Sequence, residues 1–207
     1  MPKEITIDDK QKALWQIIAI FIIPIMLIYY DIIPKDFRVI ILTVMCTVIY
    51  LFIKKEKWSI HEIGLSNHTF KKYLMPYLIF MITGVFGIVL FADKFNMDPQ
   101  PEWWTKPHFL FMFIIVSVFQ EFAYRAFLIP KLKIVFSDNL GIVLINALLF
   151  TLLHIIFPFP QIMLPLAFSG GLVFAVIYIK YPNLVLVSIA HSVLNFVAVL
   201  YGFFVIH

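Results

Sequence analysis

The sequence predicts an all-α, polytopic membrane protein with about seven transmembrane helices around a polar intramembrane cavity. Of the 207 residues, 62% are hydrophobic and 14% are charged, against roughly 45–50% and about 25% in ordinary soluble domains. Long stretches contain no Asp, Glu, Lys or Arg, and Cys46 is the single cysteine. The composition therefore excludes a soluble globule, a disordered chain and a disulfide-bonded scaffold.

Charge-free runs define the first three predicted spans, which are residues 13–30, 39–53 and 73–92. Each run is long enough, or nearly so with tilt, to cross the hydrocarbon core. The residues before the first run are charged, and no small-residue cleavage site follows it. We therefore expect the first span to be retained rather than removed as a signal peptide.

The fourth predicted span begins near residue 108 and contains Gln120, Glu121 and Arg125. We expect it to continue through Pro130 to about residue 136, with Lys131 and Lys133 snorkelling to the surface. Only this longer helix places Glu121 at the same depth in the membrane as His154, the polar residue of the fifth span.

Three more spans follow the fourth. The charge-free run 139–179 is about twice the length that one span requires, so it must fold into two. Pro158 and Pro160 supply the break, because proline cannot continue a helix and constrains the residue before it. The last run, residues 181–207, forms the seventh span.

The distribution of Lys and Arg predicts a multi-pass protein of the cell membrane with its N-terminus in the cytoplasm and its C-terminus outside. In that orientation the cytoplasmic segments hold most of the basic residues, and the outer segments hold Lys35, Arg38, Lys94 and Lys106. Trp103 and Trp104 would lie near the outer interface. Such loops account for the net positive charge, so nucleic acid is not an expected partner, whereas the lipid bilayer is.

Polar side chains inside the predicted spans are the candidates for function, because such residues are costly in lipid and face protein or water. They are Gln120, Glu121, Arg125, His154, His191 and Asn195. Glu121 and Arg125 are four residues apart, so they share a helical face and can pair. The same spacing joins Phe150 to His154 and His191 to Asn195. We expect the three helices to converge on one polar pocket.

The combination of these side chains is typical of a hydrolase. A carboxylate and an imidazole can deprotonate a water, while a second imidazole and an amide can donate hydrogen bonds to an oxyanion. Each residue alone is about as often a structural ion pair or a hydrogen bond between helices. Glu121, His154 and His191 could also hold a catalytic zinc. We rank that zinc site below a mechanism without a cofactor.

Three ordered motifs resemble the CPBP family, which is named for CAAX proteases and bacteriocin-processing enzymes and is also called the Abi family. The motifs are Q-E-x-x-x-R, F-x-x-x-H and H-x-x-x-N on successive hydrophobic helices. The similarity covers roughly residues 108–199, which would form the catalytic core. Residues 1–107 would supply the first three helices of a single transmembrane domain, residues 1–207.

The resemblance implies an intramembrane glutamate-dependent endopeptidase that hydrolyses a peptide bond in a membrane-associated peptide or protein. It implies that a glutamate and His154 activate the water, and that His191 and Asn195 form the oxyanion site. Arg125 would hold a carboxylate, and Phe150 would pack beside His154 on the substrate side.

The first motif departs from the family pattern E-E-x-x-x-R, because Gln120 replaces the first glutamate, which usually has the catalytic role. Glutamine cannot accept the proton. Either Glu121 acts as the base, with Gln120 contributing to substrate binding, or the chain is inactive and serves as an immunity or scaffold protein. We favour the active form because the other motif residues are all present.

The substrate and one further alternative follow from weaker signals. Richness in Lys, Ile and Phe is typical of AT-rich bacterial genomes, and small bacterial relatives are associated with bacteriocin self-immunity and peptide processing. We therefore favour a bacterial peptide over a prenylated CAAX protein as the substrate.

A transporter or proton-relay protein is a further alternative, and it would use Glu121, His154 and His191 as its relay. The three motifs and the lack of an internal repeat count against it.

Overall fold

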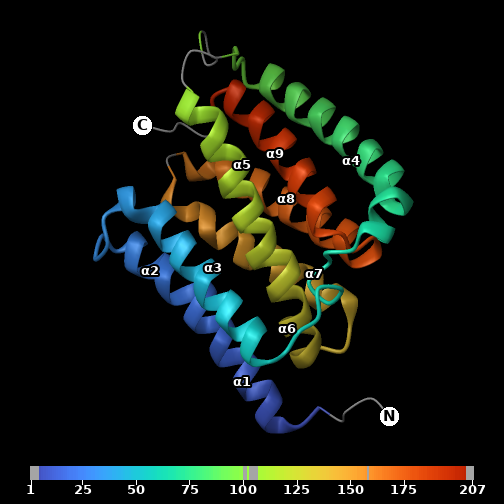
Figure 1. Cartoon of the computed structure of the whole chain (residues 1–207). Helices are drawn as coiled ribbons and strands as arrows, with labels where there is room; N and C mark the ends of the chain where they lie inside the picture. The colour runs from blue at the N-terminus through green and yellow to red at the C-terminus, as the bar shows by residue number, and fades with distance from the viewer. Residues whose placement is uncertain (1–4, 100–101, 103–106, 158, 204–207) are drawn as a thin grey trace.

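The computed structural model describes residues 5–99, 102, 107–157 and 159–203, and for residues 107–112 it describes the backbone alone. Within these ranges the chain forms helices and no strand (Figure 1). Six of the described helices are long and apolar enough to cross a membrane, and a shorter apolar helix completes the set. The predicted all-α membrane fold is therefore confirmed.

The first half of the chain follows the predicted charge-free runs. Its elements are α1 (Ile7–Ile17), η1 (Ile18–Ile22), α2 (Ile23–Tyr29), η2 (Lys35–Phe37), α3 (Arg38–Lys55) and α4 (Asn67–Lys94). Thr6 caps α1 in a reciprocal capping box with Asp9. The π-helical turn η1 comes just before Pro24, which has no N–H for the helical ladder. The elements α1, η1 and α2 therefore form one span.

The second half contains the three motifs. Its elements are α5 (Pro107–Glu121), η4 (Phe122–Leu128), α6 (Ile129–Val135), α7 (Asn139–Leu153), η5 (His154–Ile156), α8 (Pro160–Lys180) and α9 (Leu184–Leu200). The fourth span continues to Val135, as the depth argument required. α8 begins at Pro160 after Phe159, whose backbone is left-handed with φ 57°. Pro158 lies outside the described residues.

Helix α9 lies between α4 and α5. It packs against α4 on one side and α5 on another, while α7 packs along α8 and α1 packs on α6 (Figure 1). Both α7 and α9 contact η4. The helices that carry the three motifs therefore meet in the protein interior.

Lys131 does not snorkel to the surface, contrary to the prediction. Its side chain is 2% exposed, and its ammonium lies 2.6 Å from a carboxylate oxygen of Glu56. The rings of Trp58 and Phe127 lie beneath the ammonium at 5.2 and 5.4 Å. Glu56 belongs to the loop after α3. No spacing pattern in the sequence predicts a contact between this loop and α6.

Three residues on which the predicted orientation partly rests, Trp103, Trp104 and Lys106, lie outside the described residues. The cytoplasmic position of the N-terminus stays a prediction.

Candidate active site

Glu121 and Arg125 form a buried ion pair where α5 passes into η4. Arg125 Nη1 lies 3.2 Å from Glu121 Oε1, and neither side chain has any exposed surface. The four-residue spacing predicted this pair. Mutual attraction offsets part of the cost of placing two charges within a membrane-spanning helix.

His191 of α9 is the imidazole that bonds directly to Glu121. Its Nδ1–H donates to Glu121 Oε1 at 2.6 Å, and the histidine side chain is 4% exposed. Glu121 Oε2 has no hydrogen-bond partner among the described residues. The family resemblance implies that the glutamate and His154 activate water and that His191 belongs to the oxyanion site. The structure instead puts the direct carboxylate contact at His191.

Two aromatic rings and a backbone carbonyl fix the direction of Arg125. Its guanidinium carbon lies 4.6 Å from the centre of the Phe150 ring and 5.2 Å from that of Phe174. Nη2 donates to the carbonyl of Gly171 at 3.5 Å. That carbonyl is within reach because α8 approaches α7 closely, so that a Cβ at Gly171 would lie 3.0 Å from Ala147 Cα. The close helix contact therefore helps to orient the ion pair.

Asn146 of α7 supports η4 from a neighbouring helix. Its Nδ2 donates to the carbonyl of Tyr124 at 2.7 Å, and the side chain is fully buried. Hydrogen bonds in a π-helix run from i to i+5, and such segments are frequent at functional sites. The Tyr124 hydroxyl donates to the carbonyl of Leu149, which joins η4 to α7 a second time. The position of Arg125 depends on this segment.

Sequence reasoning missed Asn146, although a signal was present. Asn146, Phe150 and His154 lie four residues apart and therefore share one face of α7. That face is the one turned toward the candidate site.

His154 lies at the end of α7, and its tautomer follows from its hydrogen bond. Nδ1 lies 2.8 Å from the carbonyl of Phe150, so Nδ1 donates and the lone pair of the neutral ring is on Nε2. The Phe150 ring centre is 4.9 Å from that of His154 and 5.8 Å from that of His191. Phe150 therefore packs against both imidazoles.

A cavity of about 410 Å³ opens beside these side chains. Phe150, His154, His191 and Asn195 form part of its wall, and α4 and α8 supply most of the remainder. Where α4 faces α8 the wall residues Thr83, Gly87, Ser169 and Val173 are exposed. The cavity is therefore open between two helices that are long and apolar enough to span a membrane.

Three candidate residues, Gln120, Glu121 and Arg125, do not contribute to the wall of this cavity. Gln120 is 7% exposed and Glu121 is fully buried, and neither lines the cavity. Asn195 does line it and donates from Nδ2 to the hydroxyl of Ser117 at 3.1 Å. Ser117 is buried on α5 and was not singled out from the sequence. The predicted roles of all these residues stay predictions.

Across the described part of the chain, no three His, Cys, Asp or Glu side chains are grouped as a metal site requires. Glu121, His154 and His191 are thus not grouped in this way, and the alternative zinc site stays a prediction. The mechanism without a metal stays a prediction.

Comparison with known protein families places a match on the second half of the chain. Residues 102–197 match the model of a family described as Type II CAAX prenyl endopeptidase Rce1-like. The matched segment includes all three motifs, and the resemblance to the CAAX protease family is confirmed. Neither the curated proteins nor the solved structures contain a match to the chain.

Proposed function

We propose that the chain is an intramembrane endopeptidase that hydrolyses a peptide bond in a membrane-associated peptide or protein. The observation that carries this proposal is the cavity that brings His154, His191 and Asn195 to one wall, with Glu121 bonded to His191 behind that wall. The family match supports a CAAX-type protease. Processing of a bacterial peptide, or immunity to a bacteriocin, is our finer hypothesis for its role.

His154 is the base in this proposal. Its Nε2 carries the lone pair and accepts a proton from water, and the resulting hydroxide attacks the carbonyl carbon of the substrate. When the C–N bond breaks, the same proton passes to the leaving amine, and the water oxygen stays in the new carboxylate. This role was shared by Glu121 and His154 in the sequence analysis.

His191 and Asn195 stabilise the oxyanion that forms on the attacked carbonyl. Asn195 Nδ2 donates one hydrogen bond from the cavity wall. The Glu121 carboxylate accepts a hydrogen bond from His191 Nδ1 and so fixes the orientation of the imidazole at the same wall of the cavity. Glu121 therefore acts through His191 and is a positioning residue, and Arg125 holds it in place.

The substrate reaches the cavity from the bilayer. The opening between α4 and α8 faces hydrocarbon in a membrane-spanning protein, and its walls include Phe80, Phe91 and Leu166. Gly87 and Gly170 also line it, and a Cβ at either glycine would meet nothing within 4 Å. Such an opening suits a strongly apolar or lipid-modified peptide that lies in the membrane.

A catalytically inactive immunity or scaffold protein is the second candidate, and two observations favour it. Gln120 stands where the family pattern has its first glutamate. Glu121 is fully buried and already bonded to His191, so it offers no exposed oxygen to a water. The cavity would then bind a peptide without cleaving it.

Cleavage of a quenched-fluorescent peptide library by the protein reconstituted in lipid nanodiscs tests the proposal. We expect wild type to cleave, and His154→Ala to lose a factor of about 10²–10⁴ in rate, as for loss of a general base. Thr151→Val is the matched control on α7, because the Thr151 hydroxyl donates to a carbonyl of its own helix. Cleavage by Gln120→Glu together with no cleavage by wild type would show that the natural chain is the catalytically inactive immunity or scaffold protein.

A further inference from the structure

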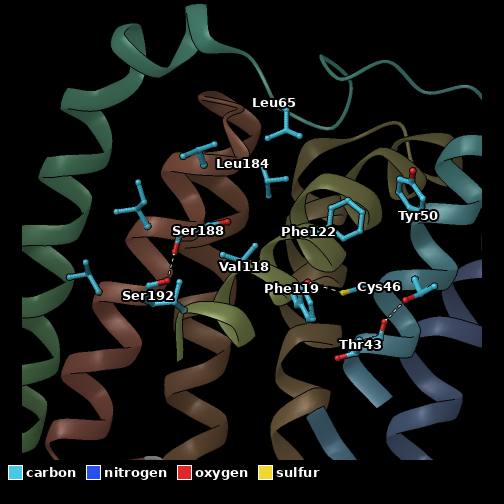
Figure 2. Close-up of a pocket in the computed structure, with 15 residues that line it drawn as sticks. Thr43, Cys46, Tyr50, Leu65, Val118, Phe119, Phe122, Leu184, Ser188 and Ser192 are labelled. Carbon is cyan, nitrogen blue, oxygen red and sulfur yellow. Dashed lines mark hydrogen bonds between the residues drawn. The ribbon is translucent and has the colours of Figure 1, made fainter. Parts of the chain in front are cut away.

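A second groove, of about 770 Å³, lies on the face of α9 opposite the candidate active site. Figure 2 shows Thr43 and Cys46 of α3 facing Ser188 and Ser192 of α9, with Val118 of α5 between them. None of its lining residues is shared with the first cavity. The groove is therefore a separate feature of the fold.

Several polar groups of this groove are bonded within the protein, whereas the buried Ser188 hydroxyl has no hydrogen-bond partner among the described residues. The hydroxyls of Thr43, Thr47 and Ser192 donate to carbonyls four residues earlier in their own helices, at 2.8 to 2.9 Å. The Cys46 thiol donates to the carbonyl of Phe119 at 3.4 Å (Figure 2). An apolar ligand therefore fits the groove, because it breaks none of these hydrogen bonds.

The length of the groove corresponds to one leaflet. Its lining residues on α9 extend from Leu184 to Val193, which is about 14 Å at the helical rise of 1.5 Å per residue. The hydrocarbon core of a bilayer is about 30 Å thick, so one leaflet is about 15 Å deep. A single acyl chain matches this length, whereas a transmembrane segment would extend well beyond it.

Basic side chains lie at one end of the groove. Tyr50 and Leu65 line that end, and the Lys54 ammonium lies 5.5 Å from the centre of the Tyr50 ring. Lys54, Lys55 and Lys57 are exposed. The nearby carboxylate of Glu56 is already bound to Lys12 and Lys131 and so does not neutralise them.

We infer that this groove binds an anionic phospholipid, with one acyl chain between α3, α5 and α9 and the phosphate beside Lys54. The charge at the basic end selects the head group, and the apolar walls select the chain. The peptide substrate is not the occupant, because the packed pair of α5 and α9 lies between the groove and the cavity that His191 lines. The Asn195–Ser117 hydrogen bond holds these two helices together. The inference is independent of the proposed function.

Native mass spectrometry of the full chain released from nanodiscs tests this inference. The nanodiscs hold equal amounts of phosphatidylglycerol and phosphatidylcholine with identical acyl chains. The variant Ile189→Trp fills the groove at an exposed lining position, and Val176→Trp is its control on an exposed face of α8. Lys54→Gln removes the head-group charge, and Lys133→Gln is its control at another exposed lysine.

We expect wild type and both controls to retain phosphatidylglycerol preferentially, and Ile189→Trp to lose it. Lys54→Gln should lower the preference for phosphatidylglycerol about fivefold, since one basic residue near an anionic surface contributes about 1 kcal/mol. Equal retention by Ile189→Trp and Val176→Trp would overturn the inference. Equal retention of both lipids by wild type would also overturn it. A dimer that Ile189→Trp dissociates would overturn it too, because the occupant would then be a second copy of the chain.

Discussion

The Glu121 carboxylate accepts a hydrogen bond from His191 at 2.6 Å, and this contact joins residues 70 positions apart in the chain. The same carboxylate oxygen lies 3.2 Å from Arg125. All three side chains are buried within apolar helices. They therefore form one unit, in which removal of any member leaves the others without compensation.

The Arg125→Met variant tests the coupling in this unit. It leaves the Glu121 carboxylate buried without its cation, so the free energy of unfolding should fall by about 3–5 kcal/mol. Unfolding of the purified protein in a detergent titration measures the change. The double variant Arg125→Met with Glu121→Gln removes both charges and should recover part of the loss. Strictly additive losses in the double variant would show that the two residues are not coupled.

The Asn146→Leu variant tests the support of the π-helical segment η4. Leucine has a similar shape but no donor, so the carbonyl of Tyr124 loses the bond from Asn146. We expect a loss of about 1–3 kcal/mol in stability, because a buried acceptor is left unsatisfied. Amide hydrogen exchange should also become faster within η4. Thr151→Val serves as the control, and a wild-type exchange pattern in Asn146→Leu would contradict the role.

Helix positions and the Glu121–Arg125 pair were within reach of sequence reasoning because both depend on local spacing. Charge-free runs marked the spans, and a four-residue separation marked the ion pair. The contact of Glu121 with His191 was not predictable in the same way. It depends on how α5 and α9 are rotated against each other, which local spacing does not determine. The predicted surface position of Lys131 was wrong for a similar reason. Its partner Glu56 is far away in the sequence, so local spacing does not predict the ion pair.

The Gly87→Phe variant tests access to the cavity from the side. Gly87 lines the opening, where a new side chain meets open space and touches none of the candidate catalytic residues. A phenyl ring there should obstruct the substrate and lower kcat/KM by about tenfold, or ~1.4 kcal/mol, mainly through KM. Gly87→Ala adds one methyl group and should behave as wild type. Unchanged KM in Gly87→Phe would place the route of access elsewhere.

The Glu56 cluster predicts how stability depends on pH. Burial alone would raise the pKa of Glu56, but hydrogen bonds from Lys131, Gln16 and Lys12 outweigh it and lower the pKa from 4.5 to about 2. A carboxyl group with a lowered pKa stabilises the fold above its unfolded pKa. This contribution should be complete above about pH 4.5 and decline as the pH falls toward 2.

Unfolding midpoints measured across that pH range check the prediction. Glu56→Gln should be less stable than wild type above pH 4.5 and should show a smaller decline on acidification. Asp36→Asn removes an exposed carboxyl group at another site and should keep the wild-type profile. A profile of Glu56→Gln parallel to that of wild type would refute the role of the cluster.

In the proposed mechanism, water that is activated by His154 in the cavity hydrolyses a membrane-associated peptide. The most direct measurement incubates the reconstituted protein with a membrane-anchored peptide in heavy-oxygen water and analyses the products by mass spectrometry. We predict cleavage by wild type with one labelled oxygen in the new carboxylate, and no such product from His154→Ala. Equal labelled product from both proteins, or none from wild type with any peptide, would contradict the claim.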